Sequence, residues 1–450
     1  MSEEKAISKK KIQRYSQRFH QDSTKEVIAD AIIRNGINDV ATNFQTIARM
    51  HYDFSEEIDV GKVTNQKRSG RCWMFAALNN IRYSISDKLN IEKHDFELSQ
   101  SFTMFWDKLE KANYFLENII KTVELDLSSR KVMWLLNNPT NDGGQWDMFT
   151  GIIEKYGIVP KYVMPESYSS SNSRIMNKIL NLKLRDNAKI LRNTYSQGAQ
   201  ISELRDKKEE MINEIYSILC YFLGEPPQSF DFEYRDKDDK FYRDEKITPL
   251  EFYEQYSELK MEDYVSIINA PTLDKPFNKT YTVEFLGNVI DGQKIHYLNL
   301  EIEQLKDLSI SQLKEGEPVW FGCDVGQMSE RESGIMDVNL YNYESVLDTE
   351  FTLDKGERLE YGESVLTHAM VLTGVNLLHD KPNRWKVQNS WGEKAGNDGF
   401  FIMSDEWFEE FNYEVVINRK YLSDKLLRDY QQEAIVLKPW DPMGSLARTY

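Results

Sequence analysis

Cysteine is scarce in this chain of 450 residues, which holds only Cys72, Cys220 and Cys323. Three cysteines do not suggest a disulfide framework, so we expect free thiols in a reducing compartment such as the cytoplasm. Cys220 and Cys323 lie in apolar segments and are expected to belong to the core. No cysteine and histidine spacing is typical of a zinc site, and there is no glycine-rich phosphate loop. The sequence therefore predicts neither a metal nor a cofactor.

Long hydrophobic runs are also missing, since no apolar stretch approaches the roughly 18 residues that a membrane-spanning helix needs. The N-terminus contains a basic cluster but no apolar segment behind it, unlike a secretory signal. We therefore expect a cytoplasmic protein without a membrane partner.

Positive charge is in deficit, because 56 Lys and Arg stand against 73 Asp and Glu, which gives a formal net charge of −17. Nucleic-acid binding needs a basic footprint, so this balance argues against a nucleic-acid partner. The chain is rich in apolar and aromatic residues instead, with a hydrophobic share of 40%, 22 Phe, 24 Tyr and 9 Trp. That composition predicts a folded protein with a large core.

Cys72 stands at the predicted start of a helix. Gly70 breaks any earlier helix, and Ser69 can cap the new one. Cys72 is expected to point away from the apolar face that five later residues mark at helical spacing, namely Met74, Leu78, Ile81, Ile85 and Leu89. A thiol in the first turn lies at the positive end of the helix dipole, and Arg68 and Arg71 add positive charge nearby. We therefore expect a nucleophilic thiolate at this position.

His368 is the histidine whose surroundings best suit a base for Cys72. The apolar, β-prone run around it predicts a buried strand, where both ring nitrogens need partners. Asn389 ends the next predicted strand, and its amide is expected to orient the imidazole, which completes the logic of a cysteine-protease triad. Trp391 is placed to cover the bond between the histidine and the asparagine. Gln66 is placed to stabilise an oxyanion together with the Cys72 backbone N–H.

Three motifs follow one another in the order of the papain superfamily, which the chain resembles: Gln66…Cys72-Trp73, His368-Ala369 and Asn389-Ser390-Trp391-Gly392. The pair Gly143 and Gly144 resembles the superfamily's Gly-Gly segment, whose backbone pairs with bound peptide. Cys72 and His368 are 296 residues apart, far beyond the roughly 130–150 of the short papain-type pattern. With this spacing, and with the C-terminal segment from Pro439 to Gly444, the chain resembles the bleomycin hydrolase and bacterial aminopeptidase C family over nearly its whole length.

The resemblance implies an α+β, papain-like cysteine protease fold of two halves, with an N-terminal extension, a large helical insertion and a C-terminal arm. It also implies a cysteine aminopeptidase of broad specificity, which removes N-terminal residues from peptides by thiolate attack and hydrolysis of the acyl-enzyme. The family forms homohexamers, so we expect peptide substrates and further copies of this chain as partners. Some members bind DNA, a property that the acidic balance of this chain does not support.

Changes of composition divide the chain into five parts. These are an N-terminal extension (1–60), a helical half with the nucleophile (61–164), a mainly helical insertion (165–277), a β-rich half with His368 and Asn389 (278–436) and an arm (437–450). Within the insertion, the charged run 231–240 predicts an exposed loop. The active site is expected in the cleft between the two halves.

The arm carries Pro439 and Pro442, which predict an extended backbone without a helix, and Trp440 is expected to anchor it. In the resembled family the arm lies in the cleft, and its terminal carboxylate receives the substrate's α-ammonium group. Members commonly end near the position of Ala447, whereas this chain continues through residues 448–450. We therefore predict that the enzyme trims these three residues and that Ala447 becomes the working terminus.

Three alternatives stay open from the sequence. The same triad serves an endopeptidase if the arm leaves the cleft free. A thioester can also pass its acyl group to an amine instead of water. The third alternative is a non-enzymatic oligomeric scaffold, against which the presence of every catalytic residue type argues.

Overall fold

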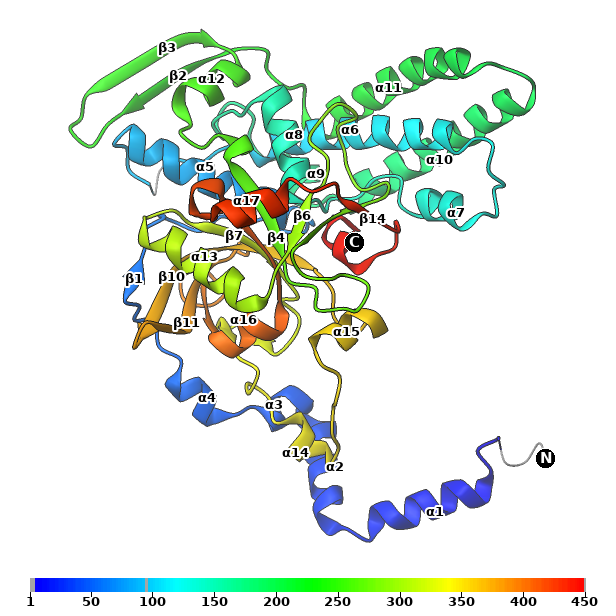
Figure 1. Cartoon of the computed structure of the whole chain (residues 1–450), viewed down its shortest axis with the longest axis vertical. Coiled ribbons are helices and arrows are strands. Elements are labelled where there is room, and N and C mark those ends of the chain that lie inside the picture. The colour runs from blue at the N-terminus through cyan, green and yellow to red at the C-terminus, as the bar shows by residue number, and fades with distance from the viewer. Residues whose placement is uncertain (1–4, 94–95, 449–450) are drawn as a thin grey trace.

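The computed structural model describes residues 5–93 and 96–448. Its body has a mostly helical half and a half built on a sheet, and a narrower N-terminal segment extends away from both (Figure 1). In the helical half, buried apolar side chains gather around α5 (Cys72–Lys88), α6 (Gln100–Lys121), α7 (Arg130–Asn137) and α8 (Trp146–Tyr156). The architecture is α+β, which confirms the predicted fold class.

Twelve strands form one mixed sheet in the other half, in the order β14-β5-β6-β4-β13-β7-β10-β11-β12-β9-β8, with β1 paired to β10. Their bounds are β1 (Glu56–Glu57), β4 (Tyr264–Ile268), β5 (Lys279–Val283), β6 (Tyr297–Asn299), β7 (Val319–Cys323), β8 (Ser329–Glu330), β9 (Ile335–Met336), β10 (His368–Leu378), β11 (Lys381–Gln388), β12 (Phe400–Ser404), β13 (Asn412–Asn418) and β14 (Ile435–Leu437). The connections contain α13 (Ile302–Lys314), α14 (Tyr343–Leu347), α15 (Lys355–Tyr361), α16 (Asp405–Phe411), η2 (Arg419–Tyr421) and α17 (Asp424–Tyr430). His368 is the first residue of β10, opposite Cys323 of β7, so the sheet presents it at a strand end.

Helix α5 runs through the interior of the molecule. It packs against α6 and α8 of the helical half and against β7 and β10 of the sheet. Every residue from Cys72 to Arg82 is buried. The prediction of a single apolar face with Cys72 away from the core is therefore wrong, because both halves cover this helix.

The predicted insertion, residues 165–277, follows the helical half in the sequence. Its helices are α9 (Tyr168–Ser171), α10 (Arg174–Ser196), α11 (Ile201–Leu223), α12 (Pro249–Tyr256) and η1 (Met261–Asp263). The charged run predicted as an exposed loop instead begins with a strand, because β2 (Phe230–Arg235) and β3 (Phe241–Ile247) form a hairpin. Tyr234 stacks on Tyr242 across the strands with ring centroids 4.8 Å apart. Aromatic pairs of this kind stabilise two-stranded pairing despite the charged neighbours.

The N-terminal segment contains α1 (Lys9–His20), α2 (Ser23–Asn35), α3 (Ile37–Ala41) and α4 (Phe44–Arg49). Neither α1 nor α2 buries a residue. Large apolar side chains on this segment are exposed, among them Ile7, Ile12, Val27, Ile33 and Phe44. Such an apolar surface is typical of a segment that contacts another protein chain.

The C-terminal arm leaves β14 and ends in a 3-10 helix, η3 (Pro442–Arg448). The prediction that its prolines exclude a helix is wrong for this stretch. Pro442 begins the helix, where its fixed φ suits the first turn, and Asp441 Oδ1 accepts the Met443 N–H at 2.9 Å.

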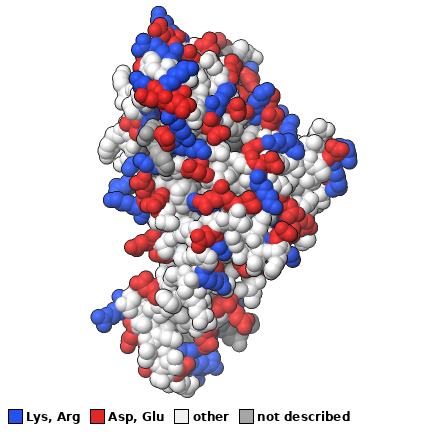
Figure 2. Space-filling model, turned by 90° about the vertical axis from the view of Figure 1, so that its left-hand side faces the viewer, with Lys and Arg blue, Asp and Glu red and all other residues white. Residues whose placement is uncertain are grey.

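Acidic and basic side chains are interspersed over the face of the molecule that Figure 2 shows. None of the described helices is both long enough and apolar enough to cross a bilayer.

Candidate active site

Cys72 begins α5, and its side chain is buried at 2% exposure. The residue before it, Arg71, occupies the N-cap position, and no side chain caps the helix. Ser69 is therefore not the cap that the sequence predicts. Its hydroxyl donates to the Gln66 carbonyl oxygen at 2.7 Å and accepts from Arg71 Nε at 2.9 Å. The Met74 N–H already donates to the Arg71 carbonyl oxygen at 3.1 Å, whereas the N–H groups of Cys72 and Trp73 have no intrahelical acceptor and can donate to a negative oxygen.

The positive charge expected beside Cys72 is partly neutralised. Arg71 is buried and forms two hydrogen bonds with the Glu166 carboxylate, at 3.0 and 2.7 Å. Its predicted contribution to a thiolate is therefore wrong, whereas Arg68 is exposed. Burial raises the pKa of the Cys72 thiol to about 11 and lowers the pKa of His368 to about 4. With these pKa values the thiol and the imidazole are both neutral near pH 7.

The orientation of His368 follows from two hydrogen bonds to Asn389. The backbone N–H of Ser390 donates to Asn389 Oδ1 at 2.7 Å, which fixes this atom as the oxygen of the amide. His368 Nε2 lies 2.9 Å from the same oxygen. An amide oxygen only accepts, so Nε2 must carry a proton. The neutral ring therefore has an unprotonated Nδ1, which is the state that a general base needs.

Gln66 is held at both ends of its side-chain amide. Ser390 Oγ donates to Gln66 Oε1 at 2.6 Å, and Gln66 Nε2 donates to the Ser69 carbonyl oxygen at 2.6 Å. The backbone N–H of Gln66 also donates to the Ser390 carbonyl oxygen at 2.8 Å. Since an amide nitrogen has two protons, one N–H of Gln66 stays available for an oxyanion.

A cleft of about 1240 Å³ brings four of the predicted residues together, because Gln66, Cys72, His368 and Trp391 all line it. Trp391 lies against the His368 ring with centroids 4.9 Å apart. Asn389 lies behind this surface and is 1% exposed. Across the described ranges, no three His, Cys, Asp or Glu side chains are grouped to hold a metal ion.

Gly143, Gly144 and Ala447 do not line this cleft. The carbonyl oxygen of Gly143 accepts from Lys111 Nζ at 2.5 Å. A Cβ at Gly144 would collide with the Trp73 ring, so this glycine allows the loop to approach α5 closely. Ala447 lines a separate cavity of about 60 Å³, which shares Asn141 with the cleft.

Two buried lysines of α6 hold the Gly-Gly loop, although local sequence patterns do not predict this role. Lys111 Nζ donates to Gly143 O and to Asp107 Oδ2, the latter at 2.7 Å. Lys108 Nζ donates to Asn141 O at 2.6 Å and pairs with Asp142 Oδ1 at 2.7 Å. Their spacing of three places both on one helix face, but nothing local marks their partners 30 or more residues away.

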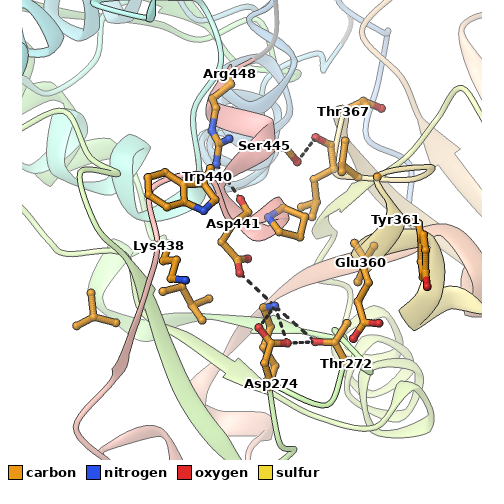
Figure 3. Close-up of a pocket in the computed structure, with 18 residues that line it drawn as sticks. Thr272, Asp274, Glu360, Tyr361, Thr367, Lys438, Trp440, Asp441, Ser445 and Arg448 are labelled. Carbon is orange, nitrogen blue, oxygen red and sulfur yellow. Dashed lines mark hydrogen bonds and ion pairs between the residues drawn. The ribbon is translucent and has the colours of Figure 1, made fainter. Parts of the chain in front are cut away.

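The arm is fixed at several points around a pocket of its own, which Figure 3 shows. Lys275, which is 3% exposed, pairs with Asp441 at 3.1 Å. Ser445 Oγ donates to the Leu366 carbonyl oxygen at 2.7 Å. The guanidinium of Arg130 lies 3.7 Å from the Trp440 ring centroid, which agrees with the anchoring expected of Trp440. Between the arm and α15 a cavity of about 1160 Å³ remains.

Comparison with known proteins places the chain in a family. The Peptidase C1-like family matches residues 6–444. Aminopeptidase C of Listeria innocua is 51% identical over 97% of this chain and 98% of its own length. Human bleomycin hydrolase is 44% identical over 91% of this chain and 92% of its own length. The crystal structure of PepW from Lactobacillus rhamnosis has a TM-score of 0.96 and 51% identity, and the match covers 99% of both chains. The chain therefore belongs to the bleomycin hydrolase and aminopeptidase C family of papain-like peptidases, and it is a cysteine-type aminopeptidase.

Proposed function

We propose that Cys72, His368, Asn389 and Gln66 are the catalytic residues of this aminopeptidase. His368 Nδ1 takes the thiol proton, and the Cys72 thiolate attacks the carbonyl carbon of the first peptide residue. Gln66 Nε2–H and the Cys72 backbone N–H donate to the oxyanion that forms. The imidazolium then protonates the leaving amine, the peptide bond breaks and a thioester remains on Cys72.

Hydrolysis of the thioester uses the same groups in reverse. His368 Nδ1 accepts a proton from water, whose oxygen attacks the thioester carbonyl carbon. The tetrahedral intermediate expels the Cys72 thiolate, which regains the proton from the imidazolium, and the free amino acid leaves. Asn389 Oδ1 accepts from Nε2–H in both halves of the cycle. The observation that carries this proposal is the fixed Nε2–H of His368, which leaves Nδ1 free in the cleft that Cys72 also lines.

Alanine variants of two cysteines test the nucleophile. We expect Cys72→Ala to lower kcat for an aminoacyl amide by about 10⁴-fold or more, since both chemical steps pass through its sulfur. Cys220→Ala is the matched control, because Cys220 lies on α11 and lines none of the cleft. Equal activity of Cys72→Ala and the control would disprove the assignment.

Substrate binding is the second part of the proposal. The backbones of Gly143 and Gly144 pair with the peptide, Trp391 covers the catalytic histidine, and Ala447 provides the arm's working terminus. Its carboxylate then forms an ion pair with the α-ammonium group of the substrate and restricts cleavage to the first residue. The proximity of the arm supports this arrangement, since the cavity that Ala447 lines borders the cleft at Asn141.

A terminus at Ala447 requires removal of residues 448–450, of which Thr449 and Tyr450 lie outside the described residues. Intact-protein mass spectrometry tests this step. The active enzyme should lack the three residues, and the Cys72→Ala variant should retain them. Retention in both proteins would contradict the trimming and the role of Ala447.

We further propose a homohexamer in the cytoplasm. The exposed apolar side chains of α1 and α2 support self-association through the N-terminal segment. Light scattering should give a mass about six times that of the 52.9 kDa chain. A monomeric mass at micromolar concentration would contradict the assembly.

A further inference from the structure

One wall of the catalytic cleft is basic, although the chain as a whole is acidic. Five cationic side chains line this cleft: Lys67, Arg68, Arg174, Lys178 and Arg185. Among the residues that the structure describes, two carboxylates line it as well, Asp142 and Asp324. The formal net charge of the chain is −17, and charges of both signs mix over the surface in Figure 2. The lining of the cleft is therefore opposite in sign to the net charge of the chain.

The cations of this wall are exposed and largely free of protein carboxylates. Within the part of the chain that the structure describes, Lys67, Arg68, Arg174 and Lys178 form no ion pair within 4.0 Å. Arg185 donates to two carbonyl oxygens, Leu136 O at 2.8 Å and Asn137 O at 3.0 Å. Its charge is thus also not neutralised by a carboxylate.

The two carboxylates of the cleft are already engaged. Asp142 is buried and pairs with Lys108 at 2.7 Å. Asp324 is also buried and accepts from Ser364 Oγ at 2.8 Å and Thr367 Oγ1 at 3.0 Å. Neither is in contact with the five cations, so the positive potential of the wall remains directed at the cleft.

Helix α10 aligns most of the wall. Arg174, Lys178, Asn181 and Arg185 all line the cleft and occur at intervals of four, three and four residues. At about 100° per residue these four positions fall on one helix face. The sequence pattern of α10 thus places its cations in a row along the cleft.

Asp142 fixes this row relative to the nucleophile. Its Oδ1 accepts from Asn177 Nδ2 at 2.8 Å, and its Oδ2 accepts from Ser173 Oγ at the start of α10. The same Oδ2 accepts the Gly70 N–H at 3.1 Å, two residues before Cys72. One buried carboxylate therefore joins the basic helix to the loop that carries the nucleophile.

We propose that this wall is a subsite for the carboxylates of peptide substrates, and that it favours peptides with negative charge near the bond that is cleaved. The inference rests on the proposed role of Cys72. The described residues of the arm line two other cavities, which meet this cleft at Thr367 and Asn141. A peptide that is bound at Cys72 with its α-ammonium group toward the arm would extend its remaining residues through the cleft that the basic wall lines. Glutamate or aspartate side chains and a free C-terminal carboxylate share the chemistry that these cations recognise.

Matched peptides locate the carboxylate. Two pairs of tripeptide amides carry glutamate or glutamine, one pair at the first position and one at the second. The third pair is trialanine with a free or an amidated C-terminus. The ratio of kcat/KM within each pair is measured in one enzyme preparation, so it does not depend on the fraction of active enzyme.

For wild type we expect at least one acid-to-neutral ratio of about 3 to 10 at low ionic strength, because several exposed cations each contribute modestly. That ratio should approach 1 in about 0.5 M salt, where the Debye length is a few ångströms. It should also fall below about 2 in the Arg174→Gln/Lys178→Gln double variant. The pair that shows the effect identifies the source of the carboxylate.

A second double variant, Lys189→Gln/Lys207→Gln, removes the same charge from exposed positions of α10 and α11 that do not line the cleft. It should keep the wild-type ratio. Three wild-type ratios near 1 would overturn the subsite, as would a ratio that both double variants lower equally. Failure of the catalytic assignment has a different signature, which is cleavage of the neutral peptides by Cys72→Ala.

Discussion

A single backbone N–H decides which way Asn389 points and, through it, which nitrogen of His368 is free. Because Ser390 N–H donates to Asn389 Oδ1, the amide cannot be flipped without facing two donors toward each other. Ser390 Oγ in turn holds Gln66 Oε1. Ser390 therefore orients both the proposed base, His368, and the proposed oxyanion donor, Gln66.

The oxyanion role of Gln66 predicts a specific loss in the Gln66→Glu variant. Glutamate keeps the size of the side chain but replaces the NH₂ donor with a carboxylate oxygen that repels the oxyanion. We expect kcat to fall by about 10²- to 10³-fold while KM changes little. Steady-state kinetics on an aminoacyl amide measure both parameters. A variant whose kcat stays within threefold of wild type would exclude Gln66 from transition-state stabilisation.

Two buried carboxyl groups, Asp147 on α8 and Glu414 on β13, have pKa values well above the usual range of carboxyl groups. Burial raises the pKa of Asp147 to about 7, and burial together with Asp147 raises the pKa of Glu414 to about 8. Both pKa values lie above those of the unfolded chain. The stability that these groups contribute is thus complete below about pH 4 and is lost as pH rises toward 8.

The Glu414→Gln variant should therefore lose less stability than wild type between pH 5 and pH 8. The free energy of unfolding changes by about 1.4 kcal/mol for each pH unit over which the folded protein holds one proton more than the unfolded chain. We therefore expect the pH-dependent losses of the variant and of wild type to differ by a few kcal/mol between pH 5 and pH 8. Urea unfolding at the two pH values gives the free energies. The exposed Glu433→Gln variant serves as the control and should follow wild type. Parallel losses in all three proteins would show that Glu414 is ionised in the folded state.

At the scale of elements, Lys275 helps to hold the arm in place and forms ion pairs with two acidic residues. Lys275 Nζ lies 3.1 Å from Asp441 of the arm and also 3.1 Å from Asp274, its neighbour in sequence. Asp441 is 9% exposed, whereas the side chain of Asp274 is 64% exposed. Variants of Asp441 and of Asp274 each remove one partner of Lys275, but only the Asp441 variant removes the contact with the arm.

We expect Asp441→Asn to loosen the arm and to increase cleavage of an N-acetylated substrate relative to its free-amine form. Lys275 keeps Asp274 as a partner, so the loss is that of one charge-assisted hydrogen bond, about 1.5–3 kcal/mol, which raises the population of a displaced arm. Asp274→Asn leaves the arm's pair intact and should keep the wild-type preference. The ratio of kcat/KM for the two substrates is the measurement. Equal ratios in both variants would mean that this pair does not hold the arm.

Elements were predictable where local pattern and tertiary packing agree. The strands that carry His368 and end before Asn389 follow from apolar, β-prone runs, and the fold class follows from them. The hairpin β2–β3 was not predicted because the segment is rich in charged residues. Its first strand nevertheless has aromatic residues at every second position, Phe230, Phe232 and Tyr234. The cap of α5 and the partners of Lys108 and Lys111 depend on loops that are distant in sequence, so local rules could not supply them.

At the scale of the whole molecule, the active site depends on contact between the two halves. Cys72 comes from a helix that both halves bury, and His368 comes from the end of a strand in the sheet. The arm returns from the far edge of that sheet, where β14 pairs with β5, to lie beside the cleft. The same architecture that closes the core thus brings the C-terminal arm next to the segment that leads into His368.

The most direct test of this account compares one fluorogenic aminoacyl amide with its N-acetylated form, with Cys72→Ala as the control. We predict that wild type cleaves the free-amine form at least 100-fold faster (about 3 kcal/mol in kcat/KM) and that Cys72→Ala cleaves neither. Cleavage of both forms at similar rates by wild type would contradict the proposal that the arm binds the α-ammonium group and restricts cleavage to the first residue. Undiminished cleavage by Cys72→Ala would contradict the nucleophile itself.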